Sequence, residues 1–274
     1  MTTHDETEAV FETAIRLAYD AGRLLRDRVG RQIEISYKGA IDLVTEVDRA
    51  AEALIGKGIA DAHPSHAMLG EEGTSTGVPI ATAEWVWVVD PIDGTTNFAH
   101  GYPSFAVSIA VVHQGVGEIG VVFDPSRDEL FAARRGGKAT LNGRQIRVST
   151  VDTMARSLIG TGFSYEQCQQ REQHEIWRHL HGTCQGIRRD GSAALAVAAV
   201  AAGRTDGFYE RPINAWDVGA GAIIVQAAGG VVTTIDGSPY DVFGQELLAS
   251  NGLIHAELID EIGAAISNAG TPVV

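Results

Sequence analysis

The sequence is poor in cysteine and in positive charge. Cys168 and Cys184 are its only cysteines, and without a CxxC pair or a dense cysteine framework we expect reduced thiols in a cytoplasm. Its 274 residues include 21 Lys and Arg against 35 Asp and Glu, a net charge of −14. Nucleic acids and anionic membranes bind basic surfaces, so we expect neither as a partner. An anionic substrate would need a cation to bring it in.

Long hydrophobic runs are also missing. No stretch of about 18 residues is apolar enough to span a bilayer, and the alanine-rich run 193–202 covers only ten residues. Residues 1–22 are acidic and amphipathic, without the basic and apolar regions of a signal peptide. With 45% apolar and 20% charged residues, the chain is expected to form a soluble globular protein with a real core.

Motifs for several other chemistries are absent or fail in their context. Glycines at 115, 117 and 120 match G-x-G-x-x-G, but a predicted strand follows them where a dinucleotide site needs a helix, so we predict a hairpin turn. His174 and His179 lie about 140° apart around a predicted helix and cannot share one zinc ion. No Gly-x-Ser-x-Gly elbow occurs, which leaves catalysis by a nucleophilic serine unsupported.

The length allows one large domain or two closely packed halves. The pattern of predicted elements changes near residue 150, and we expect a single domain over 1–274 with halves of about 1–148 and 149–274. In the first half, apolar residues follow helical spacing at Val10, Ala14, Leu17, Ala21 and Leu24. A second helix fits 47–62, with four residues expected to be buried: Val47, Ala51, Leu54 and Gly58. Strands are predicted at 85–89, 104–113, 117–124 and 130–133, and the last three form an antiparallel meander.

The second half alternates strands with helices. Its predicted helices are 166–181, 192–202, 216–228 and 253–266, and its predicted strands are 208–209, 231–234 and 247–250. Gly203 and Gly229 stand where two of these helices should end. We find no internal repeat and no flexible linker between the halves.

The densest chemical signal lies in the segment WVVDPIDGTTNF. A buried run ends at Asp90, which places its carboxylate at the carboxyl edge of a sheet, where ligands of α/β proteins bind. Pro91 is predicted to bring Asp93 back beside Asp90, and two such carboxylates repel unless a cation lies between them. Gly94 and Thr95 then offer N–H and hydroxyl groups to a phosphate at a helix start. Pro-x-Asp-Gly alone more often marks a simple turn, but the combination favours metal-assisted phosphoryl transfer.

Three further acidic segments each allow an ordinary interpretation and a functional one. Glu71 and Glu72 follow a short apolar run and fit either a solvated turn or a site. Asp217 lies in the first turn of a predicted helix behind Asn214, where capping alone would explain it. The segment DLVTEVD, which ends at Asp48, reads as a capped helix start. A capping role and a metal role do not exclude each other.

Together, these segments resemble the inositol monophosphatase family of lithium-sensitive, magnesium-dependent phosphatases. They follow the family's order over nearly the whole chain, from about residue 38 to 251. The matching segments are DLVTEVD, GEE at 70–72, DPIDGTTNF at 90–98, LNG at 141–143, GSAA at 191–194, WDVGAG at 216–221 and AGG at 228–230. The resemblance implies an αβαβα sandwich of two coupled halves that forms a homodimer.

The same resemblance implies two to three Mg²⁺ ions in one site. Glu71, Asp90 and the carbonyl of Ile92 would hold the first, and Asp90, Asp93 and Asp217 the second. A third, weaker ion would depend on Glu71 through water.

The resemblance also implies roles for residues around the metals. Glu71 and Thr95, with Asp48 hydrogen-bonded to Thr95, would orient and deprotonate the attacking water. Glu72 would lie one layer behind the metal ligands, and Lys38 in the loop near the third metal. The implied substrate contacts are Asp93, Gly94, Thr95, Gly191, Ser192, Ala193, Glu210 and Asp217. For Glu210 the alternative is a surface acid paired with Arg211.

The implied reaction is hydrolysis of a phosphate monoester by in-line attack of metal-activated water. The expected partner is a small phosphorylated metabolite. We expect myo-inositol 1-phosphate, because TTNFAHGYP and FYE look most like the inositol monophosphatase branch. The alternatives are hydrolysis of fructose 1,6-bisphosphate, histidinol phosphate or adenosine 3′,5′-bisphosphate, and a regulatory binding protein on the same scaffold.

Overall fold

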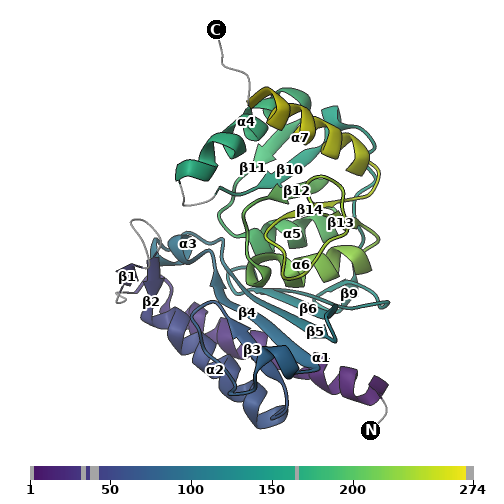
Figure 1. Cartoon of the computed structure of the whole chain (residues 1–274). Coiled ribbons are helices and arrows are strands. Elements are labelled where there is room, and N and C mark those ends of the chain that lie inside the picture. Colours follow the sequence, from purple (N-terminus) through teal and green to yellow (C-terminus); the bar gives the residue numbers. More distant parts are fainter. Residues whose placement is uncertain (1–2, 32–34, 38–42, 164–166, 270–274) are drawn as a thin grey trace.

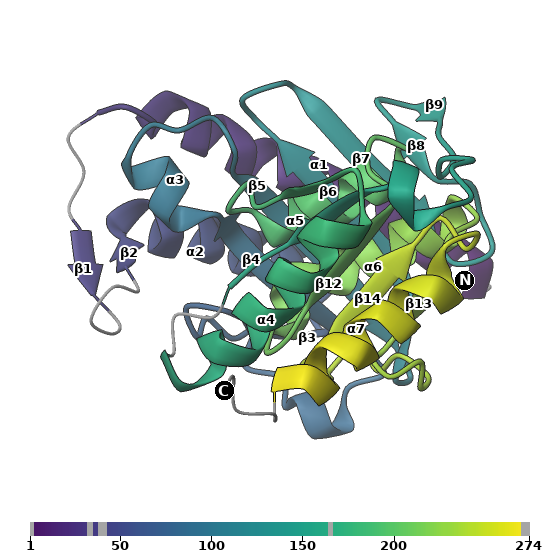
Figure 2. The ribbon, with the colours of Figure 1, turned by 90° about the horizontal axis from the view of Figure 1, so that it is seen from above.

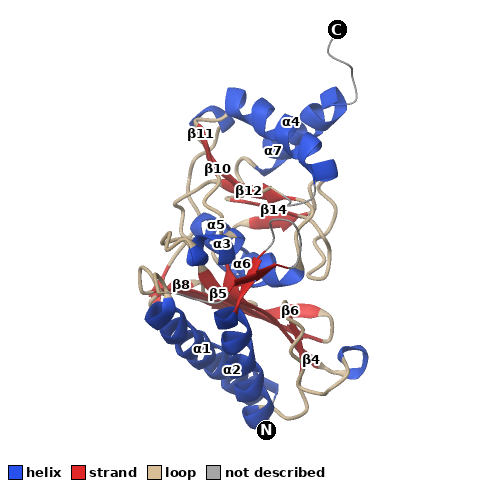
Figure 3. Ribbon diagram, turned by 90° about the vertical axis from the view of Figure 1, so that its left-hand side faces the viewer, coloured by secondary structure: helices blue, strands red, loops and turns tan. Residues whose placement is uncertain are grey.

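Five layers of secondary structure alternate through the molecule (Figures 1 and 3). The computed structural model describes residues 3–31, 35–37, 43–163 and 167–269. The layers are a helix pair, a seven-stranded sheet, a second helix pair, a five-stranded sheet and a third helix pair. The expected αβαβα sandwich is therefore confirmed.

The first layer packs its two helices on each other and on the seven-stranded sheet. They are α1 (Thr3–Arg28) and α2 (Glu46–Ala62). The buried apolar residues of α2 are Val47, Ala51, Ile55 and Ile59. Leu54 and Gly58, expected in that face, are only partly buried. Position 58 lies against α1, where an added Cβ would come within 2.3 Å of Leu17. In α1, Leu25 replaces Leu24 as the buried residue.

The second layer is a sheet of mostly antiparallel strands in the order β3-β4-β5-β6-β7-β8-β9. The strands are β3 (Ala67–Gly70), β4 (Trp85–Asp93), β5 (Ala106–His113), β6 (Val116–Asp124), β7 (Glu129–Arg134), β8 (Thr140–Leu141) and β9 (Arg144–Gln145). Only β3 runs parallel to its neighbour, β4. The predicted meander is confirmed as β5, β6 and β7.

Strand β4 is longer than predicted. We expected it to stop before Asp90, but it continues to Asp93. Along β5, Asp90 pairs with Ser108 and Asp93 with Ala106, so β4 has one extra residue between the two pairs. Such a bulge tolerates Pro91, which cannot donate a ladder hydrogen bond, and it redirects the side chains around it.

The middle layer separates the two sheets with α5 (Ala193–Ala201) and α6 (Ala215–Ala227). Its close contacts depend on glycine. A Cβ at Gly120 of β6 would lie 2.3 Å from the carbonyl oxygen of Ala220, and one at Gly221 would lie 2.7 Å from Cβ of Val197. The absence of these side chains lets α6 touch both β6 and α5.

The remaining two layers complete the second half. The five-stranded sheet has the order β11-β10-β12-β14-β13. Its strands are β10 (Leu158–Thr161), β11 (Gly186–Arg188), β12 (Gly207–Glu210), β13 (Val231–Thr233) and β14 (Leu247–Ser250). Helices α4 (Gln167–Thr183) and α7 (His255–Ala269) pack together over its outer face. Residue 166, the predicted start of α4, lies outside the described residues.

Short elements lie beside these layers. The hairpin of β1 (Ile35–Tyr37) and β2 (Leu43–Thr45) lies at one side of the molecule, near α3 (Thr95–Ala99) (Figure 2). Two 3₁₀ turns are η1 (Ile80–Thr82) and η2 (Met154–Arg156). No helix in the described part of the chain has the length and apolar character that a bilayer span requires.

Candidate active site

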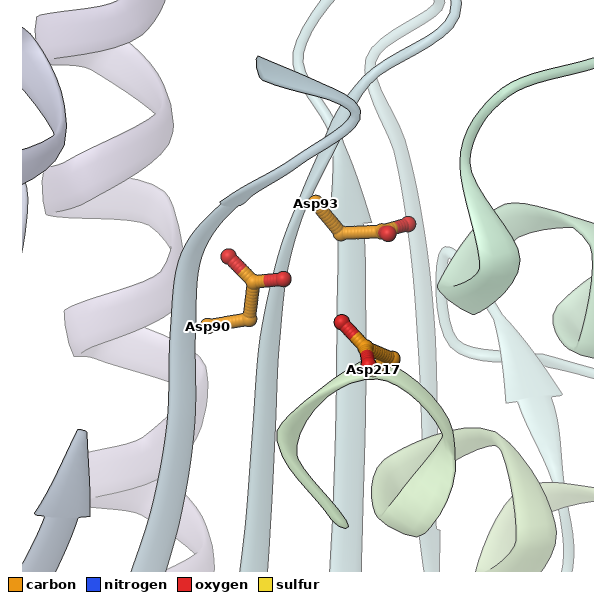
Figure 4. A group of neighbouring side chains, drawn as sticks. All are labelled: Asp90, Asp93 and Asp217. Carbon is orange, nitrogen blue, oxygen red and sulfur yellow. The ribbon is translucent and has the colours of Figure 1, made fainter. Parts of the chain in front are cut away.

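Three carboxylates converge where β4 ends and α6 begins (Figure 4). Asp90, Asp93 and Asp217 each place one oxygen within 4.8 Å of the other two. Asp90 and Asp93 are buried and Asp217 is partly buried. These residues are predicted to lie together, and the structure brings them together from opposite halves of the chain.

The electrostatics of this cluster are unfavourable in the absence of a cation. Burial, followed by Glu71, Asp93 and Asp217, raises the pKa of Asp90 well above its ordinary value. Burial and then Asp93 raise the pKa of Asp217 to about 8. Like charges held this close in a poorly solvated place disfavour ionisation, whereas a bound cation favours it. Carboxylate oxygens are the donors that Mg²⁺ prefers, so the donor set fits that ion.

Local hydrogen bonds hold two of the carboxylates. Asp90 Oδ1 accepts a bond of 2.9 Å from the N–H of Ile92. Asp217 Oδ2 accepts a bond of 2.9 Å from the N–H of Asn214, which caps α6. The predicted capping role of Asp217 is therefore present, and its carboxylate also belongs to the acidic cluster.

Asp93 joins the first half of the chain to the start of α5. Its carboxylate accepts hydrogen bonds from the hydroxyl of Ser192 and from the N–H groups of Ala193 (3.2 Å) and Ala194 (2.8 Å). Burial raises the pKa of Asp93 to about 6, and these three bonds oppose the rise. The donors that we assigned to the substrate, Ser192 and Ala193, thus contact Asp93.

A buried acid that the sequence analysis missed shapes the turn that carries Glu71. Glu52 of α2 accepts hydrogen bonds from the N–H groups of Glu72 (2.8 Å) and Thr74 (2.7 Å). A Cβ at Gly70 would lie 2.5 Å from the Glu52 carboxylate, so a larger residue there would displace that carboxylate. Glu71 itself lines the cavity described below, whereas Glu72 gives its N–H to Glu52.

Thr95 occupies a fixed place at the start of α3. Its Oγ1 lies 3.1 Å from Oδ1 of Asp48 and 2.9 Å from the carbonyl oxygen of Ile92. Asp48 also accepts a 2.8 Å bond from the N–H of Thr45, the cap of α2, and its burial raises its pKa. Gly94 precedes with φ of +94°, and a Cβ there would lie 2.9 Å from the carbonyl oxygen of Ser104. A side chain at 94 is therefore excluded.

Glu210 ends β12 and faces the same space. Burial, then Asp217 and Asp93, raises its pKa to about 8, while Arg189 lowers it. A Cβ at Gly162 would overlap the Glu210 carboxylate. The alternative of a surface pair with Arg211 is wrong, because Arg211 forms its ion pairs with two other acids, Glu172 and Glu246.

Most of these groups line one cavity of about 440 Å³. It is lined by the following predicted residues: Glu71, Asp90, Ile92, Asp93, Gly94, Thr95, Gly191, Ser192, Ala193, Glu210 and Asp217. Asp48 and Glu72 do not line it: Asp48 contacts Thr95, and the N–H of Glu72 bonds Glu52. Lys38 lies outside the described residues. Phe163, Arg189 and Gln245 also line it.

Two further residues connect the halves beside the site. The side-chain amide of Asn97 donates to the carbonyl oxygens of Ser104 (2.7 Å) and Asp190 (2.8 Å). The hydroxyl of Ser108 donates to the carbonyl oxygen of Trp216 (2.8 Å), in the first turn of α6. Asn97 belonged to a recognised segment, but no local pattern indicated its partner 93 residues away.

The chain belongs to the inositol monophosphatase family, whose family model matches residues 6–267. This is a family of phosphatases. The chain is 44% identical to an inositol-1-monophosphatase of Synechocystis over 92% of this chain and 88% of the relative. It is 45% identical to the Nus factor SuhB of Pseudomonas aeruginosa over 84% of this chain and 87% of that relative. The crystal structure of the extragenic suppressor protein suhB from Bartonella henselae superposes with a TM-score of 0.87, at 38% identity, over 93% of this chain and 98% of that one.

Proposed function

We propose that the protein is a Mg²⁺-dependent phosphatase that hydrolyses myo-inositol 1-phosphate to myo-inositol and phosphate. The observation that carries the proposal is the cluster of Asp90, Asp93 and Asp217 in one cavity with the start of α3. A cation site beside N–H donors is the arrangement that a phosphate monoester requires. The family name and the Synechocystis relative support inositol phosphate as the substrate.

In this proposal the metal ligands are Glu71, Asp90, the carbonyl of Ile92, Asp93 and Asp217, for two to three ions. Bound Mg²⁺ would neutralise the phosphate charge and make water nucleophilic at neutral pH. The chain's own groups do the positioning. Thr95, anchored between Asp48 and the Ile92 carbonyl, would orient the attacking water, and its N–H with that of Gly94 would hold the phosphate.

The alcohol side of the substrate would lie against Glu210 and the 191–193 segment, which line the same cavity. An ionised Glu210 would accept hydrogen bonds from ring hydroxyls, and a site built to bond hydroxyls rejects substrates that lack them. The proposal further takes the protein to be a single-domain, cytoplasmic homodimer that is inhibited by Li⁺.

Phosphate release with Mg²⁺ tests the proposed reaction. The panel contains myo-inositol 1-phosphate, fructose 1,6-bisphosphate, histidinol phosphate and adenosine 3′,5′-bisphosphate, each with and without EDTA and with Li⁺ at tens of millimolar. We expect the inositol ester to give the highest kcat/KM, with loss of turnover in EDTA and inhibition by Li⁺. Phosphate release that continues in EDTA would contradict the Mg²⁺-dependent reaction. A higher kcat/KM on another ester of the panel would make that ester the substrate in place of myo-inositol 1-phosphate.

A second candidate function is regulatory binding on the same scaffold. The observation that favours it is the name Nus factor SuhB carried by the Pseudomonas relative. An Asp217→Asn variant separates the two functions, because it should abolish phosphate release without altering surfaces outside the cavity. A cellular role that this variant fully supports would favour the regulatory function.

A further inference from the structure

Ser108 lies where the first half of the chain meets α6. It is fully buried in the middle of β5 and lies directly opposite Asp90 in the ladder between β4 and β5. Its hydroxyl donates a 2.8 Å hydrogen bond to the carbonyl oxygen of Trp216. Trp216 precedes Asp217 in the first turn of α6. One side chain therefore connects the strand position of Asp90 to the helical turn that carries Asp217.

The neighbours of Ser108 on its face of β5 are apolar. Side chains alternate between the two faces of a strand, and Ala106, Ala110 and Val112 on the same face belong to the apolar core that α6 shares. An alanine at 108 would fit this row, because it is smaller than serine. A buried hydroxyl costs free energy unless it is hydrogen-bonded. The bond to Trp216 offsets a cost that an alanine would not incur, so packing alone does not account for the hydroxyl.

Further along α6, the contacts with the sheet are close but carry no direction. A Cβ at Gly219 would lie 3.3 Å from Cβ of Ala110, and one at Gly120 of β6 would lie 2.3 Å from the carbonyl oxygen of Ala220. Packing contacts of this kind fix the position of a helix along its own axis less sharply than a hydrogen bond, which requires a particular distance and angle. A slip of about 1.5 Å, the rise of one helical residue, would break the bond from Ser108.

We infer that Ser108 is a positioning residue that fixes the start of α6 so that Asp217 faces Asp90 across the cation site (Figure 4). The inference rests on the proposed function, because bound Mg²⁺ is what makes the separation of the two carboxylates matter. Without a cation these carboxylates repel each other, and the bond to Trp216 opposes the separation of their two segments. The hydroxyl thereby reduces the reorganisation that Mg²⁺ binding requires.

Mg²⁺ binding to Ser108→Ala measures this contribution directly. Calorimetric titration without substrate should give a Kd for Mg²⁺ about 3- to 10-fold higher in the variant than in the unsubstituted protein, the range equivalent to one net hydrogen bond. Phosphate release from myo-inositol 1-phosphate should need correspondingly more Mg²⁺ to reach half of its maximal rate. The kcat at saturating Mg²⁺ should stay within about twofold, because excess metal restores the arrangement that binds it.

Val112→Ala is the matched control. Val112 is buried on the same face of β5, but it pairs with Val86, at the opposite end of β4 from Asp90. Its truncation should lower the melting temperature by leaving a cavity in the core, without changing the Kd for Mg²⁺. An equal rise of the Kd in Val112→Ala would overturn the inference, since general loosening of the core would then explain the result.

Ser108→Cys separates the hydrogen bond from the volume of the side chain. Cysteine is no smaller than serine but is a weaker donor, so its Kd should fall between those of the unsubstituted protein and Ser108→Ala. Full recovery of the affinity in Ser108→Cys would assign the effect to volume and overturn the inference.

The same measurements separate a failure of the inference from a failure of the proposed function. If the unsubstituted protein neither binds Mg²⁺ nor releases phosphate, the proposed function itself fails. If it does both, an unchanged Kd in Ser108→Ala, or a loss confined to kcat at saturating Mg²⁺, overturns the inference alone.

Discussion

The two ends of strand β4 both bury titratable side chains, with opposite results. At its carboxyl end, Asp90 and Asp93 lie close to Asp217, and all three described side chains of this cluster are carboxylates. At its amino end, Trp85 stacks between His66 and His113, with ring centroids 5.5 and 4.0 Å apart. Burial raises the pKa of the acids and lowers that of His66 to about 4, so both ends disfavour charge.

The difference lies in how the polar groups are satisfied. His66 Nδ1 accepts a 3.1 Å hydrogen bond from Trp87 Nε1, and His63 Nε2 lies 3.1 Å from Thr13 Oγ1. The histidine end is therefore complete as a neutral, packed structure. The acidic end is incomplete until a cation arrives. A buried titratable cluster thus points to ligand binding when its charges remain uncompensated, and to structure when its partners are already in place.

The largest expected effect breaks the acidic end. Asp217→Asn keeps an oxygen acceptor for the N–H of Asn214 but removes a charge from the acidic cluster. We expect kcat/KM with Mg²⁺ to fall by at least about 10³-fold. In EDTA above pH 8, where repulsion is greatest, we expect the free energy of unfolding to rise by roughly 1–3 kcal/mol.

Urea denaturation and phosphate release measure these two changes, and Asp61→Asn on the exposed face of α2 is the control. Asp217→Asn that loses activity without any gain of stability in EDTA would show that the cluster is not strained.

The second effect concerns Glu52, which lies near the acidic end of β4 but does not belong to the carboxylate cluster. Glu52→Gln keeps the size of the side chain but weakens two hydrogen bonds to the turn after Gly70. We expect a loss of about 1–3 kcal/mol in the free energy of unfolding, because charged acceptors are the stronger ones. We also expect a weaker apparent affinity for Mg²⁺, since the turn positions Glu71. Measuring activity and melting temperature as Mg²⁺ is added separates the loss of stability from the loss of Mg²⁺ affinity. If neither the stability nor the affinity of Glu52→Gln differs from that of the unsubstituted protein, Glu52 does not support the turn.

The third effect is the pH dependence of the histidine end. His66 has a pKa of about 4 in the folded protein against 6.5 ordinarily, so between these values the unfolded chain binds a proton that the folded protein does not. The free energy of unfolding should therefore fall as the pH drops from 7 to 5, by at most about 2 kcal/mol. His66→Gln keeps an acceptor for Trp87 and should flatten this dependence in urea titrations.

The acidic end should show the reverse slope in the metal-free protein. Asp217, with its pKa raised to about 8, keeps a proton in the folded state that the unfolded chain releases above its ordinary value. Stability from this group is complete at low pH and is lost as the pH rises toward 8. Mg²⁺ should abolish this slope and leave that of His66 unchanged. A Mg²⁺ effect on both slopes would mean that the ends are coupled.

The smallest expected effect is at the outer ring of the stack. His113→Phe keeps a flat ring against Trp85, so the free energy of unfolding should change by less than about 1 kcal/mol and phosphate release should not change. His113→Ala, which removes the ring, should lose more. Equal losses in the two variants would show that the imidazole nitrogens, and not the ring, matter at this end.

The acidic end could be predicted in large part from sequence because its signals are local. Asp90, Pro91 and Asp93 lie within four residues, and the capping of α2 and α6 follows from Thr45 and Asn214. What the sequence could not reveal depends on contacts between distant segments. Local spacing does not show that Glu52 reaches the turn after Gly70, or that the start of α5 donates to Asp93.

The same limit explains the errors in the fold. Leu54 and Gly58 fit a helical stripe, but the buried face of α2 is set by where α1 and the sheet lie, which places Ile55 and Ile59 inside. The end of β4 was predicted too early because proline usually terminates a strand; pairing with β5 across a bulge overrides that preference. His66 was not singled out because its role depends on Trp87, whose ring approaches only in the folded sheet.

The position of α6 between the sheets has a consequence for how the chain is made. The seven-stranded sheet is fully synthesised once β9 has ended at Gln145, but α6, which covers most of its inner face, begins only at Ala215. During synthesis, that apolar face stays exposed until α6 has been made. A truncated product that ends before α6 would keep the face exposed and aggregate. The same turn of α6 that completes the cover delivers Asp217 to the acidic cluster. The nascent chain therefore completes its carboxylate cluster in the same step that covers the apolar face, the docking of α6 on the sheet.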